Sequence, residues 1–470
     1  MTVGVEWKHI LLFSLPILAG QFFQQLYNTV DSIVVSHFAG ATQEACDIAL
    51  AAVGGCVSLT FLFLAVAVGM SNGGAVLVSQ LFGARLRADM KKAAATLFLA
   101  MLILGAAVSV LGAALARPII QLLLDIRDPE VMDQAVVYFS IYAAGLVFQY
   151  TYNAVAATLR AVGDSKATLY FLAVAAVLNV VLDLFFVISF GWGAAGVAVA
   201  TVIAQAACAV VSVIYMVRRY PDFRFFNRAD FRADRHKLAL ILRLGIPATI
   251  QQMVISLGNV FVQRLVNSFG RAAMNAFTVG NRMEVYALIP LFSLNTSMAT
   301  FTGQNVGAGR YDRVRRGWWQ AILLAIAISG IVAVVLYTFA YSLADIFNVS
   351  GEARALAVQF IRFMSLFVFI FASYIPTTGL LQGAGDAIWS TISSLVSLSA
   401  RVACAYFLAL GLEMGFAAVW IATPAGWGAG LVVASSRYFS RRWMTKAVAG
   451  PAATGEALPE SQGEESPSEL

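Results

Sequence analysis

Apolar segments of about twenty residues recur along the whole chain, and short polar or charged stretches separate them. A run of this length lets a helix cross the hydrocarbon core of a bilayer, which is about 30 Å thick. The pattern therefore predicts an all-α polytopic membrane protein with twelve transmembrane helices. We place these spans at residues 9–37, 48–75, 92–116, 131–158, 167–190, 193–217, 238–268, 274–301, 315–341, 353–381, 388–411 and 415–438.

Composition supports this assignment to the membrane. Of the 470 residues, 60% are hydrophobic and 12% are charged, whereas a soluble protein carries about 25% charged residues. The first apolar stretch continues past any small-residue cleavage site, so we expect the first span to be retained and not removed as a signal peptide.

The basic residues are distributed unevenly between the two sides of the predicted membrane. If the amino terminus is cytoplasmic, the inner segments hold 22 of the 31 Lys and Arg residues and the outer segments hold four. This positive-inside pattern predicts that both termini are cytoplasmic. We expect the membrane to be the inner membrane of a bacterium or archaeon. Binding to nucleic acid is not needed to explain the sequence pI of 9.2.

The same helical pattern is present twice in the chain. Residues 14–40 resemble residues 245–270, and "QLFGARLRADMKKA" at 80–93 resembles "QNVGAGRYDRVRRG" at 304–317. Because each half holds six helices, an even number, both halves run the same way through the membrane. We therefore predict two pseudo-symmetric six-helix bundles around a central cavity, an architecture typical of transporters.

Four segments follow from this repeat. We expect an N-terminal six-helix lobe at residues 1–217, a cytoplasmic linker at 218–237 and a C-terminal six-helix lobe at 238–446. The last segment, 447–470, is rich in Glu and cannot bury a core, so we expect a disordered acidic tail.

Polar residues form stripes on the first and seventh helices. Asp31 shares one face of its helix with Gln21, Gln24 and Asn28, because all recur at spacings of three and four. Such atoms cannot face lipid without losing hydrogen bonds, so they line either water or a neighbouring helix. We favour a shared cavity, and we predict its lining as Gln21, Gln24, Tyr27, Asn28, Gln149, Gln252, Ser256, Asn259, Gln263 and Glu284.

A second polar group lies on the fourth to sixth helices. Asn179 and Asp183 are one turn apart, as are Gln149 and Asn153. A carboxylate at the bilayer centre costs at least about 2.5 kcal/mol, so Asp183 and Asp31 should face the bundle interior. If the two meet, they can carry a proton, and with Asn and Thr oxygens they can instead ligate sodium. The sequence leaves both ions open.

Other chemistry has little support. The four cysteines show no metal-ligand spacing and the three histidines are scattered, so we expect no enzymatic site and no cofactor. The second half has no carboxylate at the position of Asp31, and we expect ion coupling in the first half.

The "LYNTVDSIVV" helix, the paired "SQLFGA" and "GQNVGAG" loops, the repeated Gly-Asp turns and "NVVLD" before "GWGAAGVAVAT" resemble the multidrug and toxic compound extrusion (MATE) family from residue 9 to about 440. The acid in the first helix, with Asn and Asp in the fifth, is similar to the prokaryotic DinF-type branch. This resemblance implies a cation site, for H⁺ or Na⁺, at Asp31, Asn179, Asp183 and Thr201, with Asn153 beside it.

The resemblance also implies a function. It predicts an antiporter that exports organic cations, drugs or other amphipathic compounds by alternating access, acting as a monomer in the bilayer. The alternative is a flippase or exporter of lipid-linked precursors or peptides in the same superfamily. Such flippases line their cavity with basic residues, and here Arg264 is the one candidate on the seventh helix.

Overall fold

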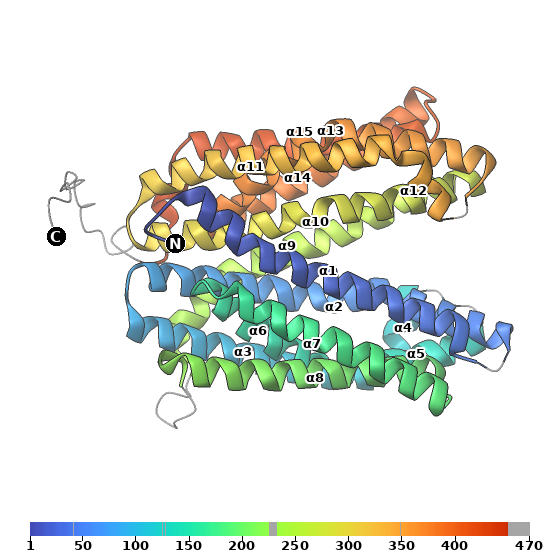
Figure 1. Ribbon diagram of the computed structural model, residues 1–470, viewed down its shortest axis with the longest axis horizontal. Helices are drawn as coiled ribbons and strands as arrows, with labels where there is room; N and C mark the ends of the chain where they lie inside the picture. The colour runs from blue at the N-terminus through green and yellow to red at the C-terminus, as the bar shows by residue number, and fades with distance from the viewer. Residues whose placement is uncertain (41, 125, 127, 225–232, 348, 450–470) are drawn as a thin grey trace, which may run out of the picture.

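The computed structural model describes residues 1–40, 42–124, 126, 128–224, 233–347 and 349–449, without the side chains of residues 256, 257, 259 and 260. The predicted acidic tail from residue 450 onward lies outside the described residues. In Figure 1 the helices form two lobes, and the amino terminus and the carboxyl end of α15 lie at the same end of the molecule. We call this the terminal end, and the opposite end the distal end.

The N-terminal lobe is built from the first eight helices. They are α1 (Glu6–Phe38), α2 (Gln43–Gly83), α3 (Arg87–Ala114), α4 (Ala116–Leu124), α5 (Pro129–Ala144), α6 (Leu146–Ala161), α7 (Ser165–Leu184) and α8 (Gly193–Arg219). The predicted fourth span is the pair α5 and α6, which bends by 42° at Gly145. A side chain at Gly145 would overlap Val202 of α8, so the bend needs glycine.

The C-terminal lobe repeats this order. Its helices are α9 (Arg235–Asn267), α10 (Arg271–Gly307), α11 (Tyr311–Thr338), α12 (Ala340–Ile346), α13 (Gly351–Gly383), α14 (Ala387–Tyr406) and α15 (Ala417–Phe439). Helices occupy all twelve predicted spans. The short helices α4 and α12, both at the distal end in Figure 1, were not predicted.

Length and composition single out most of these helices as membrane spans. Within the described residues, ten helices are long and apolar enough to cross a bilayer, and the bent pair of α5 and α6 makes eleven. The remaining predicted span is α10, which is 37 residues long but carries Arg282 and Glu284 in its interior. Among the described helices of the twelve predicted spans, α10 is thus the one that length and composition alone do not single out.

The two lobes also share irregular features. A π-helical turn follows α7 at Phe185–Ser189, and another follows α14 at Phe407–Gly411. Both Gly-Asp turns hold the last helix of their lobe. Asp164 caps α7 and accepts hydrogen bonds from Tyr215 and Tyr220, both 2.9 Å.

The C-terminal counterpart of this turn is a buried ion pair. Arg437 of α15 donates to Asp386 over 2.6 Å, and both side chains are less than 10% exposed. Removal of one partner leaves an uncompensated buried charge, which costs about 3–5 kcal/mol. We therefore expect Arg437→Ala to lower the apparent melting temperature of the purified protein strongly. Arg354→Ala removes the exposed pair with Asp345 and should change it far less; equal effects would contradict this account.

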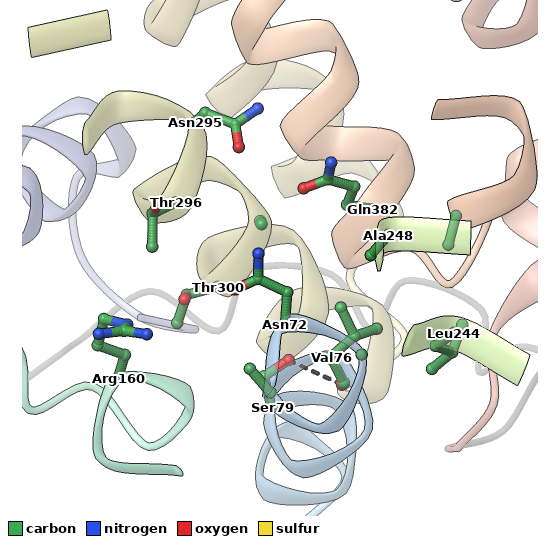
Figure 2. Close-up of a pocket in the computed structure, with 14 residues that line it drawn as sticks. Asn72, Val76, Ser79, Arg160, Leu244, Ala248, Asn295, Thr296, Thr300 and Gln382 are labelled. Atoms are coloured by element: carbon green, nitrogen blue, oxygen red, sulfur yellow. Dashed lines mark hydrogen bonds between the residues drawn. The ribbon is translucent and has the colours of Figure 1, made fainter. Parts of the chain in front are cut away.

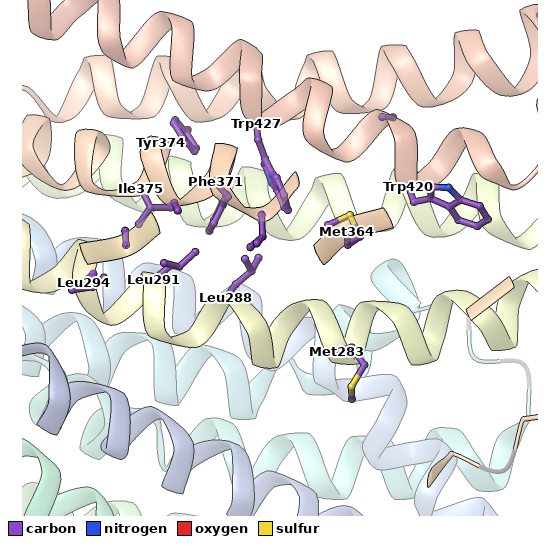
Figure 3. Close-up of a cluster of buried hydrophobic side chains, with 14 of the residues drawn as sticks. Met283, Leu288, Leu291, Leu294, Met364, Phe371, Tyr374, Ile375, Trp420 and Trp427 are labelled. Carbon is purple, nitrogen blue, oxygen red and sulfur yellow. The ribbon is translucent and has the colours of Figure 1, made fainter. Parts of the chain in front are cut away.

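The apolar cores lie inside the lobes. Figure 3 shows the C-terminal core, in which Leu288 and Leu291 of α10 face Phe371 of α13 and Trp427 of α15. At the terminal end, residues near the start of each lobe's first helix pack in the core of the other lobe. Ile10 of α1 packs in the C-terminal core, while Ile241 and Leu244 of α9 pack in the N-terminal core.

The lobe boundaries predicted from the repeat therefore need one correction at the carboxyl end. Residues 447–449, which we assigned to the disordered tail, are described and ordered. Val448 and Ala449 donate backbone hydrogen bonds to Gln80 at 2.8 and 3.2 Å. The acidic composition of the residues beyond them misled the prediction, because the first three are apolar and small.

Candidate cation and substrate sites

Two carboxyls meet inside the N-terminal lobe, where α1 packs beside α7. Asp31 and Asp183 lie within hydrogen-bonding reach of each other, and Asp183 is 0% exposed. Oδ1 of Asp31 and both oxygens of Asp183 are buried without a well-formed hydrogen bond to any described residue. Buried polar atoms are rarely left in this state, so the pair offers oxygens to a ligand from outside the chain.

The amide and hydroxyl predicted to assist them are close by. Asn179 lies one turn before Asp183 on α7, and its Nδ2 donates to Thr201 Oγ1 of α8 over 3.4 Å. This leaves Oδ1 of Asn179 buried without a partner. Asn153 is bound within its own helix, because its Nδ2 donates to the carbonyl of Gln149 over 2.8 Å.

Three tyrosines surround the acids. Tyr27 of α1 and Tyr138 and Tyr142 of α5 each interact electrostatically with Asp31. The rings of Tyr138 and Tyr142 stack with centroids 6.3 Å apart. Phenolic hydroxyls can donate to a carboxylate, so this wall can orient the acids while it excludes lipid.

The composition of this group restricts the ion it can take. Its unpaired atoms are oxygens of two carboxyls and one amide, which suit a proton or a hard monovalent cation. Among the described residues there is no group of three or more His, Cys, Asp or Glu that could hold a metal ion. We call Asp31, Asp183, Asn179 and Thr201 the acid site.

A separate pocket lies between the lobes, toward the terminal end (Figure 2). It encloses about 580 Å³ of space, part of it open to solvent. Its walls come from both lobes: α2 and α6 on one side, and α9, α10, the end of α13 and the start of α14 on the other. The lining residues are Asn72, Gly73, Ala75, Val76, Ser79, Arg160, Leu244, Ala248, Asn295, Thr296, Ala299, Thr300, Gln382 and Ala387.

Two glutamines close the lobes against each other at the terminal end of this pocket. Gln80 of α2 donates to the carbonyl of Gly383 over 2.9 Å, and Gln304 of α10 donates to the carbonyl of Ala161 over 2.8 Å. They occupy matching positions in the "QLFGA" and "QNVGA" repeats. The amino group of Met1 donates to Gln304 over 3.1 Å, so each glutamine also binds one end of the chain.

Glycines bring the backbones of α2 and α10 together at the same level. A Cβ at Gly83 would overlap the carbonyl oxygen of Gln304, and a Cβ at Gly307 would overlap that of Gln80. The contact is reciprocal, as the internal repeat requires. Within the described residues, the hydrogen bonds between the two lobes lie in the terminal half of the molecule. The lobes are therefore closed against each other at the terminal end.

Comparison with known proteins gives the same duplicated pattern. The MatE family model matches residues 16–185 and matches again at 247–407, which together make up more than half of the chain. The chain belongs to the MatE family. Members of this family are membrane transporters and not enzymes, so this chain is a multi-pass membrane transporter.

Curated relatives of this MatE chain cover nearly its whole length. It is 27% identical to the probable multidrug resistance protein YoeA of Bacillus subtilis, over 94% of this chain and 95% of that one. It is 22% identical to a probable multidrug resistance protein NorM of Thermotoga maritima, over 88% of each. A FAD transporter of Shewanella oneidensis is 25% identical over 73% of this chain and 75% of its own length.

Solved structures share the fold. A crystal structure of MATE in complex with MaL6 superposes with a TM-score of 0.86 at 24% identity, covering 93% of this chain and 96% of that one. An outward-facing multidrug resistance MATE family transporter of the MOP superfamily gives 0.85 at 24% identity with the same coverage. The MATE fold expected from the sequence is therefore confirmed.

The MatE chain places the predicted cavity residues in several environments. Tyr27 and Gln149 are buried within the N-terminal lobe, whereas Gln21 and Gln24 are partly buried and Asn28 is exposed. Gln263 donates to Asn267 on its own helix over 2.8 Å. Gln252 is partly buried, and the side chains of Ser256 and Asn259 lie outside the described residues. Of the eight whose side chains the structure describes, none lines the pocket between the lobes.

Glu284 lies elsewhere than predicted. It lines a small pocket inside the C-terminal lobe with Met364, Ser365 and Trp427, and Arg401 is the nearby charge that acts on it. Its position on α10 turns it into its own lobe and away from α2. We predicted a central-cavity residue, whereas in this structure its side chain lines a pocket inside the C-terminal lobe.

Sequence reasoning missed a polar network next to the interlobe pocket. Gln251 donates to Ser394 over 2.7 Å and accepts from Gln382 over 3.0 Å. Asn295 donates to the carbonyl of Ile375 over 2.9 Å. The adjacent "QQ" at 251–252 signalled a polar face on α9, but the helical stripe selected Gln252 and not its neighbour.

Proposed function

We propose that this MatE protein is an ion-coupled antiporter that exports small amphipathic compounds, including organic cations and drugs, in exchange for H⁺ or Na⁺. The single observation that carries the proposal is the acid site, where Asp31 and Asp183 present buried oxygens that no described residue satisfies. Two carboxylates this close repel each other, and one bound cation relieves that repulsion.

Helix α1 connects the acid site to the closed end of the molecule. Asp31 lies in its distal half, while Glu6 at its start pairs with Arg313 and Arg316 of α11, each at 3.4 Å. Ser297 of α10 also donates to the carbonyl of Ile10 over 2.7 Å. Ion binding at Asp31 therefore acts on the helix that holds the two lobes together.

A proline in α1 gives that helix a place to bend. Pro16 lies between Asp31 and the cross-lobe contacts. Proline has no N–H, so the carbonyl of Leu12 loses its helical donor and the local helix is weakened. A change at the acid site is thereby converted into a change in the angle between the halves of α1, which shifts the alternating-access equilibrium.

Family membership leaves the substrate open, because the relatives' names include both multidrug resistance proteins and a FAD transporter. We infer that one chain acts as a monomer, since the acid site lies within one lobe and the pocket lies between the two lobes of the same chain.

The coupling ion is tested with purified protein in liposomes, with pH and sodium gradients imposed separately. Dye or drug accumulation under only one of the two gradients identifies the coupling ion. Accumulation that is the same with and without either gradient would contradict the proposed antiport.

We further propose that the terminal end is cytoplasmic, in a bacterial or archaeal inner membrane. The basic residues gather there, as the positive-inside rule requires. Glu130 at the distal start of α5 and Arg224 after α8 are both exposed. An impermeant maleimide should label Glu130→Cys from outside intact cells and Arg224→Cys only after the membrane is opened; labelling of both from one side would contradict the orientation.

A further inference from the structure

Among the described residues, Arg160 is the one charged residue that lines the pocket between the lobes. It lies in the last turn of α6, and the next residue, Ala161, accepts the hydrogen bond from Gln304 that closes the lobes. Figure 2 shows its guanidinium on one side of the pocket, with Asn72 and Ser79 on α2 and Thr296 and Thr300 on α10. The cation is therefore at the closed end of the substrate path.

The guanidinium has no acidic neighbour in the pocket. The fourteen lining residues include no Asp or Glu, and within the described part of the chain the guanidinium of Arg160 forms no ion pair or hydrogen bond. Among the described residues, the group that interacts electrostatically with this guanidinium is the phenol of Tyr152, two turns earlier on α6. The neighbouring acid, Asp164, is already bound by Tyr215 and Tyr220.

The other polar residues of the pocket suit the same kind of ligand. Asn72 and Thr300 can each donate a hydrogen bond. A planar guanidinium with several donors around it is the arrangement that binds carboxylate and phosphate groups. A cationic group here would be repelled, because the pocket contains positive charge and no formal negative charge.

We propose that Arg160 binds the anionic group, a carboxylate or phosphate, of an amphipathic substrate at the closed end of the interlobe pocket. The apolar lining residues Val76, Leu244 and Ala248 then contact the apolar part of that substrate. This inference rests on the proposed transport function and narrows its substrate class. The proposal also places the two charged ligands of the transport cycle at different sites. The coupling ion binds at the acid site, and the substrate anion binds at Arg160.

The test is calorimetric binding of two matched probes to the full chain in phosphatidylcholine nanodiscs. The probes are 4-phenylbutyl phosphate and 4-phenylbutyltrimethylammonium, which share the apolar part and differ in charge. We expect Arg160→Gln to weaken phosphate binding by about tenfold or more and Arg160→Lys to restore much of it. Arg243→Gln, which removes an exposed arginine beside Leu244, should leave phosphate binding unchanged.

A second arm distinguishes a soluble substrate from a lipid headgroup. If the anion that Arg160 binds is a lipid phosphate, nanodiscs with phosphatidylglycerol should weaken binding of the soluble phosphate to wild type; unchanged binding assigns a soluble organic anion. The proposal is overturned if wild type does not bind the phosphate probe in either disc. It is equally overturned if Arg160→Gln binds it like wild type, or loses both probes alike. Binding needs no gradient, so these outcomes are independent of whether ion coupling holds.

Discussion

Asp31→Asn is expected to abolish gradient-driven export, lowering drug accumulation in liposomes by about tenfold or more under whichever ion gradient drives the wild type. The amide has nearly the shape of the carboxylate but cannot take up a proton, and it carries no charge to hold Na⁺. One elementary charge crossing 100 mV releases about 2.3 kcal/mol, and the variant loses access to this energy. Asp183→Asn should have the same effect, because both acids belong to one site.

The control for this substitution is Asp47→Asn. Asp47 lies on α2, is exposed and accepts a hydrogen bond from Gln43 over 3.0 Å, so loss of its charge should leave transport unchanged. Binding of a drug to Asp31→Asn in the absence of a gradient should also persist, which separates loss of coupling from misfolding. Export by Asp31→Asn at the wild-type rate under both gradients would remove the acid site from the mechanism.

Gly83→Ala is expected to have the second large effect, because it prevents the lobes from closing at the terminal end. The added methyl group overlaps the carbonyl oxygen of Gln304. Because this oxygen belongs to the helix backbone and not to a flexible side chain, it cannot move aside easily. Overpacking costs about 1–3 kcal/mol, enough to shift a two-state equilibrium by roughly 5- to 150-fold. The variant should spend most of its time open at the terminal end and transport slowly. Gly307→Ala should reproduce this, because it meets Gln80 in the same way.

This shift is measured by the reaction of an introduced cysteine, Thr300→Cys in the interlobe pocket, with an impermeant maleimide. The reagent should reach it from the terminal side in the Gly83→Ala background and far less in the wild-type background. Gly54→Ala on the same helix is the control, because a Cβ there meets nothing within 4 Å. Equal labelling in all three backgrounds would show that the crossing does not close the path.

The fold could be predicted from the sequence because the bilayer imposes a strong constraint on it. A spanning helix must be apolar over about twenty residues, so every span left a visible signal, and the duplicated motifs fixed their grouping into two lobes. Helices α4 and α12 left no such signal, since they are nine and seven residues long. The bend at Gly145 was also missed, because α5 and α6 together read as one continuous span.

The acid site was predictable for a related reason. Asp31 and Asp183 are conspicuous in apolar surroundings, and the spacing of Asn179 and Asp183 places them on one face. The tyrosines around them were not predictable, because Tyr138 and Tyr142 resemble ordinary packing residues until α5 is placed against α1. Whether the site binds an ion stays a prediction, which the experiments above test.

The interlobe pocket was the part that sequence reasoning did not reach. Its lining depends on which faces of α2, α9 and α10 cross, and a helical stripe does not define how two helices cross. The "QLFGA" and "QNVGA" repeats served only as signs of the duplication and of the family resemblance, although their glutamines and glycines hold the lobes together. Arg160 was counted as one of many basic residues at a helix end, because its pocket exists only in three dimensions.

The most direct test of the account reverses the usual direction of coupling. Liposomes with wild-type protein are loaded with drug, no ion gradient is imposed, and the movement of H⁺ and of ²²Na⁺ is recorded as the drug flows out. Antiport through the acid site predicts that one of these ions accumulates inside the liposomes above its external concentration as long as the drug gradient lasts. Liposomes with Asp31→Asn should show no such accumulation. Drug efflux without countermovement of either ion in the wild type would contradict it.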